Sequence, residues 1–447
     1  MTQNYFSILD IFIAFIWLII LSIAVNNQAS KIENPELRSY YSLNFYVKVA
    51  SGIIFTLFYI LYYGGGDTAA YWDGAVVMNK LLFKSPSLYI DAMLNPPTPE
   101  NRLIYFNIET GFPPGWIYRE EEGWFVTKIA SIISIVTFRS FLATVVIFAY
   151  FVSTTTWKVF ELVSKLNLHS IKVAARCMLF VPSVGFWCSG ITKDTIIYVS
   201  ILNILFYTLD VLILKSKINY IHVLSIIFYL FIISHIRSFA LAATIAPLLV
   251  AFGTRLTNKY GSSTFAKVGF RTLFIGAGVG FFITFFSSSY VAKLAEEASV
   301  VQNDFKNNST YTGKKYDIGT IDGTPTGMLM AFPISVFYGV YKPLIYESFS
   351  ATLILNGLES SVLVIMTILF FFNGNVFKKI ARIRSNEFLV FAFVFTILIG
   401  FMAGYTSVLY GVLVRIRAPL LPFLFLIFTT KPEEIKKTED NLLTENK

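Results

Sequence analysis

Cations stand at the ends of apolar runs in several places of this sequence, where each could bind an anion. They are Lys193, Arg237, Lys342, Arg415 and Arg417. A charge near an apolar core is costly unless it is paired or hydrated, so such residues are candidates for function. Arg415 and Arg417 could present a planar fork of donors to a phosphate or pyrophosphate. Lys193 could likewise bind an anionic group in an outward-facing cavity.

An acidic partner for these cations follows a glycine run at 64–66. Such a turn lets the backbone approach a ligand closely. If a helix begins there, Asp67 and Tyr71 share one face, a turn apart, and Asp73 lies to one side. A carboxylate in this position could activate a hydroxyl group, so Asp67 and Asp73 are candidate catalytic residues.

Three further side chains could belong to the same site. His235 is a candidate general base, because it is the histidine that falls in a predicted outer segment. Trp187 stands shortly before Lys193 and could pack a lipid-like or sugar-like ligand. Glu347 follows Lys342 closely and could form one wall of the site.

The sequence also allows a structural role for each of these residues. Asp194 could neutralise its neighbour and cap the following helix, and Glu347 could be the anion at another helix start. Arg237 could snorkel to lipid phosphate, and Asp67 could be a helix N-cap. Arg415 and Arg417 could anchor the chain at the membrane interface. All these candidate residues fall on the same predicted face of the membrane, and this joint occurrence favours a common site.

The composition places the chain in a membrane. Of 447 residues, 55% are hydrophobic, 17% are aromatic and only 14% are charged, which is far more apolar than an ordinary soluble protein. The net charge of +9 comes from short basic clusters between apolar segments, the pattern of cytoplasmic loops, so we expect no nucleic-acid partner. Cys177 and Cys188 match no metal or redox spacing, and no metal or cofactor is expected. We expect the first apolar run to remain as a membrane helix rather than to be removed as a signal peptide.

The apolar runs predict an all-α integral membrane protein with about eleven transmembrane helices. They cover residues 7–25, 47–63, 140–156, 173–189, 194–214, 221–236, 238–254, 271–288, 349–373, 387–404 and 418–430. Alternate loops, such as 374–386, carry most of the basic residues, and such loops are cytoplasmic. This assignment puts the N-terminus outside and the C-terminus inside.

The predicted organisation is one polytopic domain, 1–430, followed by a polar cytoplasmic tail, 431–447. The outer face has two long loops, about 64–125 and 289–348. Short connections near 190–194, 236–238 and 405–417 complete this face. The first loop predicts a compact aromatic cap, and an interfacial helix should follow it at 124–139.

Taken together, these segments resemble two families of membrane enzymes. The stretch Gly65-Gly66-Asp67-Thr68-Ala69-Ala70-Tyr71-Trp72 resembles the first-loop acidic motif of polytopic GT-C glycosyltransferases, which use lipid-phosphate-linked sugars. The turn at 186–194, the short spans around Arg237, and the closing Arg415 and Arg417 look like bacterial O-antigen and exopolysaccharide polymerases. The resemblance implies that Asp67 is catalytic, that the three arginines hold a pyrophosphate, and that Lys193 and Lys342 support them. This chain departs from GT-C enzymes in lacking a soluble domain.

Glycosyl transfer from a lipid pyrophosphate suits these residue types. It needs a carboxylate to activate the acceptor hydroxyl and cations to stabilise the departing phosphate. We therefore expect a glycosyltransferase or polysaccharide polymerase in the bacterial cytoplasmic (inner) membrane, independent of metal. Its partners would be a polyprenyl-pyrophosphate-linked glycan, membrane lipid and other envelope polysaccharide proteins.

Two other functions remain open at this stage. A transporter or flippase of a lipid-linked or anionic substrate would also place cations in an outward cavity, but it predicts charges at mid-membrane. A scaffold in an envelope complex predicts that Asp67, Arg237 and Arg415 tolerate substitution.

Overall fold

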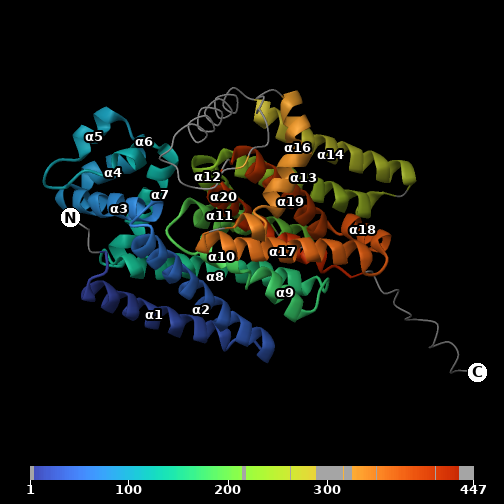
Figure 1. The fold of residues 1–447 in the computed structure, drawn as a ribbon, viewed down its shortest axis with the longest axis horizontal. Helices are drawn as coiled ribbons and strands as arrows, with labels where there is room; N and C mark the ends of the chain where they lie inside the picture. The colour runs from blue at the N-terminus through green and yellow to red at the C-terminus, as the bar shows by residue number, and fades with distance from the viewer. Residues whose placement is uncertain are drawn as a thin grey trace, which may run out of the picture.

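The computed structural model describes residues 5–213, 218–261, 263–287, 316, 325–348, 350–407 and 409–431. Within these ranges the chain is helical (Figure 1), and nine segments are long and apolar enough to cross a membrane. They are α1 (Ile8–Ala29), α2 with its π-helical end η1 (Pro35–Leu57, Phe58–Tyr62), α8 (Phe141–Lys165), α11 (Lys193–Ile213), α13 (Ser238–Tyr260), α14 (Thr264–Ser287), α17 (Ala351–Phe372), α19 (Glu387–Thr406), and the closing segment of α20, η3 and α21 (Tyr410–Arg417, Ala418–Leu420, Leu421–Phe428). The prediction of a helical, multi-pass membrane fold is therefore supported.

Two shorter apolar helices accompany these segments. They are α12 (Tyr220–Ile236), which matches a predicted run, and α16 (Pro325–Tyr341), which packs on α19. α16 lies in the second half of the predicted outer loop 289–348, where the sequence turns apolar. Apart from Tyr316, the first half of that loop lies outside the described residues, as does the tail after Lys431.

The prediction of one continuous span at 173–189 was wrong. The chain forms two short helices there, α9 (Ile171–Met178) and α10 (Pro182–Trp187), with a break between them. Pro182 is the first residue of α10, and proline fits that position because it has no N–H to donate. The same ring restricts the preceding residue to extended backbone, so the helix ends before it.

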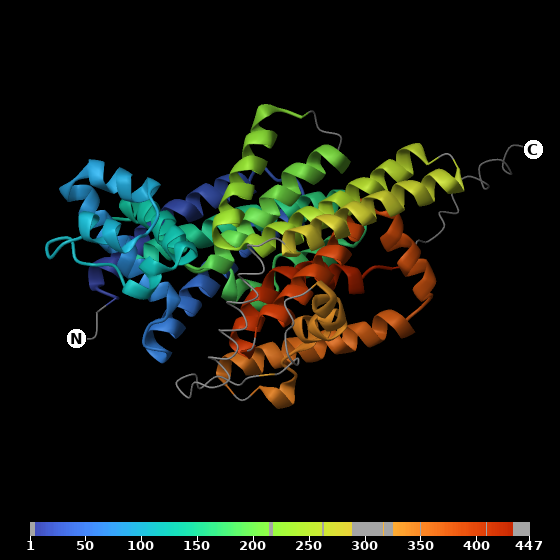
Figure 2. The same cartoon turned by 90° about the horizontal axis from the view of Figure 1, so that it is seen from above.

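The predicted outer loop 64–125 is a helical cap. It contains α3 (Asp67–Lys84), α4 (Pro86–Leu94), α5 (Pro99–Tyr105) and α6 (Gly115–Arg119), and it leads into α7 (Glu121–Val136). α7 corresponds to the interfacial helix predicted at 124–139. The cap lies at one end of the molecule in both views, away from the α13–α14 turn and from the basic helix α18 (Val376–Ser385) (Figures 1 and 2).

The centre of the bundle is formed by α8, α11, α19 and the closing segment, whose side chains are largely buried. By contrast, α1 and α14 expose most of their apolar side chains, which suits helices that face lipid. Asp10 of α1 accepts hydrogen bonds from the Phe141 N–H at 2.6 Å and the Ser140 hydroxyl at 2.8 Å. This buried carboxylate caps α8 and fixes α1 to it.

Candidate functional site

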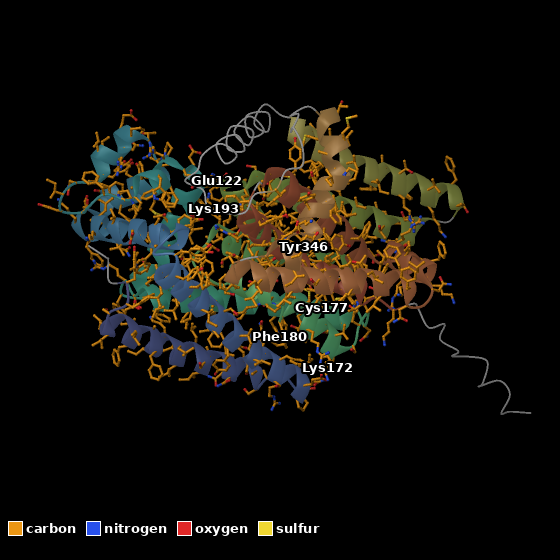
Figure 3. The ribbon with its side chains drawn as sticks, viewed as in Figure 1. Glu122, Lys172, Cys177, Phe180, Lys193 and Tyr346 are labelled. Atoms are coloured by element: carbon orange, nitrogen blue, oxygen red, sulfur yellow. The ribbon has the colours of Figure 1, made fainter. Side chains whose placement is uncertain are left out.

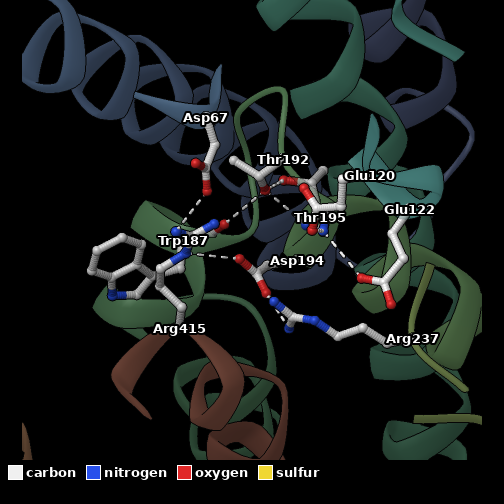
Figure 4. Close-up of polar contacts among 10 residues, drawn as sticks. Asp67, Glu120, Glu122, Trp187, Thr192, Asp194, Thr195, Arg237 and Arg415 are labelled. Atoms are coloured by element: carbon white, nitrogen blue, oxygen red, sulfur yellow. Dashed lines mark hydrogen bonds and ion pairs between the residues drawn. The ribbon is translucent and has the colours of Figure 1, made fainter. Parts of the chain in front are cut away.

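Arg415 joins two acidic residues from different parts of the chain (Figure 4). Its Nη1 donates to Asp67 Oδ2 at 3.0 Å, and its Nε donates to Asp194 Oδ2 at 3.1 Å. The Asp194 side chain is 1% exposed, whereas that of Asp67 is 36% exposed. Arg415 therefore connects an accessible carboxylate at the edge of the cap with a buried one inside the bundle.

A second arginine completes this group. Arg237 Nη1 donates to Asp194 Oδ1 at 2.7 Å, so each oxygen of Asp194 accepts from a different guanidinium. We call Asp67, Asp194, Arg237 and Arg415 the aspartate–arginine cluster. Its two carboxylates and two guanidiniums balance in formal charge, and their hydrogen bonds offset the cost of burying them.

Local backbone geometry places Asp67 at the cluster. Gly66 has φ of 98°, and a Cβ added there would lie 3.0 Å from the Tyr59 ring. Only glycine adopts this backbone region readily, and the close ring leaves no space for a side chain. α3 begins directly afterwards, so the Asp67 carboxylate is in its first turn and points at Arg415.

Trp187 lies under the same guanidinium, with its ring centroid 5.9 Å from Arg415 Cζ. A cation over an indole ring is attracted to the π-electrons of the ring. The tryptophan side chain is 4% exposed, so its position is fixed by packing. The structure thus brings Trp187 to the cluster as a support for Arg415.

Lys193 belongs to a neighbouring group rather than to the cluster itself (Figures 3 and 4). Its ammonium contacts Glu120 and donates to Glu122 Oε2 at 3.1 Å. The alternative in which Lys193 and Asp194 neutralise each other does not occur, because each binds oppositely charged residues elsewhere. Sequence reasoning missed both glutamates, although a run of three acidic residues at the start of α7 was a signal.

Tyr71 lies between the two groups. It is one turn after Asp67 on α3, as predicted, and it is 1% exposed. Burial, followed by the nearby charges of Asp67 and Glu120, holds the pKa of the Tyr71 hydroxyl well above its ordinary value. Tyr71 is therefore a neutral hydroxyl group in this site rather than a base.

Asp73 and His235 are placed in other surroundings. Asp73 Oδ2 accepts from the Tyr5 hydroxyl at 3.0 Å, and burial raises the pKa of this aspartate. It lines a separate cavity of about 430 Å³ together with Lys80. His235 is exposed, and its ring stacks on Phe125 with centroids 5.2 Å apart.

Lys342 and Glu347 form a second polar group between α16 and α17, around the short helix η2 (Ile345–Glu347). Lys342 Nζ donates to Glu347 Oε1 at 2.7 Å, and the Tyr410 hydroxyl donates to the same oxygen at 3.0 Å. Burial alone would raise the pKa of Glu347, but the hydrogen bonds from Lys342, the Leu344 N–H and Tyr410 lower it below its usual range. This group is a compact, internally paired unit.

Arg417 lies in the closing segment and is fully buried. Its Nη1 donates to the carbonyl oxygens of Val340 and Lys342 at 3.2 and 2.8 Å and to Ser360 Oγ at 2.9 Å. The expectation that Arg415 and Arg417 lie in the connection before the final span was wrong, because both are helical residues of α20. Arg417 ties α20 to the end of α16 and to α17.

In the described part of the chain, no three His, Cys, Asp or Glu side chains come together as metal ligands. Comparison with protein-family models, with characterised proteins and with solved structures finds no match to this chain. The chemistry of the aspartate–arginine cluster is therefore the basis for a function.

Proposed function

We propose that this protein is a membrane glycosyltransferase or polysaccharide polymerase that uses polyprenyl-pyrophosphate-linked glycans at the outer face of the bacterial cytoplasmic membrane. The observation that supports it most strongly is the position of Arg415 between the accessible Asp67 and the buried Asp194. Both the carboxylate and the cations that the reaction needs meet there.

The cluster suggests how the substrate engages it. A pyrophosphate group that approaches from the exposed side competes with Asp67 for Arg415 Nη1, while the buried Asp194 keeps Arg415 and Arg237 in place. Arginine suits this task because its planar donors match phosphate oxygens. Once released, the Asp67 carboxylate is free to accept a proton.

The glycosyl transfer step needs only groups that the cluster and the substrates supply. Asp67 takes the proton of an acceptor hydroxyl, whose oxygen forms a bond to the anomeric carbon of the donor sugar. The bond from this carbon to the pyrophosphate oxygen breaks, and the electron pair leaves with the polyprenyl pyrophosphate. The arginines stabilise the charge that develops on the leaving group.

The proposed topology has eleven crossings, with the N-terminus outside and the C-terminus inside. The broken pair α9 and α10 together make one crossing, because they lead from the end of α8 back to Lys193 beside the cap. The basic helix α18 then lies on the cytoplasmic side, in keeping with the excess of Lys and Arg in cytoplasmic loops. This orientation puts the cluster at the outer face.

One observation favours a transporter or flippase as the second candidate. Lys48 lies inside the α2 span, is fully buried, and its ammonium has no hydrogen-bond partner among the described residues. A buried cation in a span is typical of a substrate or ion path.

A glycan profile of cells separates these functions. The cells carry Asp67→Asn, Arg237→Ala or Arg415→Ala, each checked for normal abundance in the membrane, and Asp73→Asn from the same helix is the matched control. If long polysaccharide is lost and lipid-linked repeat units accumulate on the outer leaflet, the result supports the polymerase. Accumulation on the inner leaflet supports the flippase. An unchanged profile contradicts both and leaves the scaffold.

A further inference from the structure

A cavity of about 610 Å³ lies beside the aspartate–arginine cluster, between the end of α4, the helix α7 and the α12–α13 turn. Its volume is within the range of small-molecule sites, about 300–1,000 Å³. The side chains that matter for recognition are Asn95, Glu121, Glu122, Phe125, Lys128 and His235.

One wall of this cavity contains two aromatic rings, Phe125 and His235, which we call the ring platform. The Phe125 and His235 rings are stacked, with centroids 5.2 Å apart and an angle of 25° between their planes. Phe231 packs against both rings, with its centroid 4.2 Å from that of His235 and 6.1 Å from that of Phe125. A flat ring surface packs well against the C–H face of a pyranose ring.

The polar lining offers both donors and acceptors. The carboxylates of Glu121 and Glu122 accept hydrogen bonds, and Lys128 donates. Lys128 Nζ is held by the carbonyl oxygens of Met93 and Asn95, each at 3.0 Å, and an ammonium has a third proton to donate. A hydroxyl group both donates and accepts, so a ligand rich in hydroxyls fits this mixture. A strongly anionic ligand would be repelled by the two glutamates.

The lining of the cavity is linked to the proposed reaction site through neighbouring residues. Glu122 accepts from Lys193, the sequence neighbour of Asp194. Arg237, which binds Asp194, stands between His235 and Ser238, and both of these residues line the cavity. Residues that line the cavity are therefore bonded to Lys193 or adjacent in sequence to Arg237, which ties the cavity wall to the cations of the proposed site.

We propose that this cavity binds a neutral saccharide segment of the glycan. The assignment of that segment as the acceptor rests on the proposed function, whereas the binding itself rests on the platform and the polar lining. Phe125 and His235 support the sugar ring, and Glu121, Glu122 and Lys128 bind its hydroxyl groups.

Binding can be measured with the purified full-length protein in lipid nanodiscs. The probe is the set of repeat-unit oligosaccharides released by mild acid from the surface polysaccharide of the producing cells and labelled at the reducing end. We expect saturable binding that Phe125→Ala and Glu121→Gln each weaken by about tenfold or more, the effect of losing about 1.4 kcal/mol. Phe112→Ala, a change at an exposed aromatic of the cap outside this cavity, is the matched control and should bind as wild type.

The outcomes separate the cavity from the reaction. Absence of binding by the wild type, or equal binding by Phe125→Ala, overturns the saccharide site, even where Asp67→Asn still abolishes polymer. If binding behaves as expected while Asp67→Asn cells keep full-length polymer, the saccharide site stands and the proposed reaction fails. Asp67→Asn should bind the oligosaccharides like the wild type, since Asp67 does not line the cavity.

Discussion

Arg415 and Asp67 are 348 positions apart in the chain, and their side chains meet at 3.0 Å. This contact joins the last candidate membrane segment to the first helix of the cap. The same guanidinium also binds Asp194 at the start of α11. One arginine thus holds together three elements, and only its bond to Asp67 is at an accessible edge that a substrate could enter.

Arg415→Lys should lower activity although it keeps the charge. A single ammonium on a shorter reach cannot reproduce the separate Nε and Nη1 bonds to Asp194 and Asp67. A hydrogen bond to a charged group contributes about 1.5–3 kcal/mol, so we expect polymer synthesis to fall by about tenfold or more. Polymer length and amount per molecule of protein in the membrane provide the measurement.

Arg417→Lys is the matched control for that change. Arg417 donates to two carbonyl oxygens and to Ser360 inside the bundle, so its replacement should lower the melting temperature. Polymer synthesis per folded molecule should stay near the wild-type rate. If Arg417→Lys and Arg415→Lys reduce the rate equally, Arg417 belongs to the substrate site as the sequence suggested.

Asp194→Asn should destabilise the fold more than Asp67→Asn. The change leaves Arg237 and Arg415 without the buried anion that both bind, and breaking a buried ion pair from one side costs about 3–5 kcal/mol. Thermal unfolding of the purified protein measures this loss. Asp210 is on the same helix as Asp194 and is the partner of His222 from α12. Asp210→Asn should cost less, because that pair is more exposed. Equal losses would show that Asp194 is not the anchor of the cluster.

The sequence predicted much of the fold because most of it is encoded locally. Long apolar runs, basic loops and the glycine turn before Asp67 are readable without tertiary information, and α1, α8 and α19 occur where such runs predict them. The proline at position 182 is a signal for the interruption between α9 and α10, but the prediction rested on the length of the apolar run alone.

The site was predictable only in part, since its contacts join distant segments. Asp67, Arg237 and Arg415 were placed on one face from topology, and the structure brings them together. Asp194 was given only a local role, as the partner of Lys193 and a helix cap, because its two arginine partners come from other helices. Asp73 and Arg417 have the right residue types and neighbours in sequence, yet helix rotation turns them toward other partners.

Glu347→Gln should change how stability depends on pH. The pKa of Glu347 is lowered in the folded protein, so its ionised form stabilises the fold above the ordinary glutamate pKa of about 4.3. That contribution is lost as the pH falls through the lowered folded-state value. The wild-type melting temperature should therefore drop more steeply than that of the variant between about pH 5 and about pH 3. Parallel curves would mean that the Lys342 and Tyr410 contacts do not stabilise the carboxylate in solution.

Cysteine labelling tests the orientation on which an outer-face reaction depends. Cys177 and Cys188 are buried and not bonded to each other, so they should give little background with a membrane-impermeant maleimide. Ser87 of the cap helix α4 and Ser385 at the end of α18 are both exposed, and each can be replaced by cysteine singly. We expect Ser87→Cys to react in intact cells with a permeable outer membrane, and Ser385→Cys to react only after lysis. The reverse pattern would place the cap and the aspartate–arginine cluster in the cytoplasm, where a reaction with outward-facing glycan cannot occur.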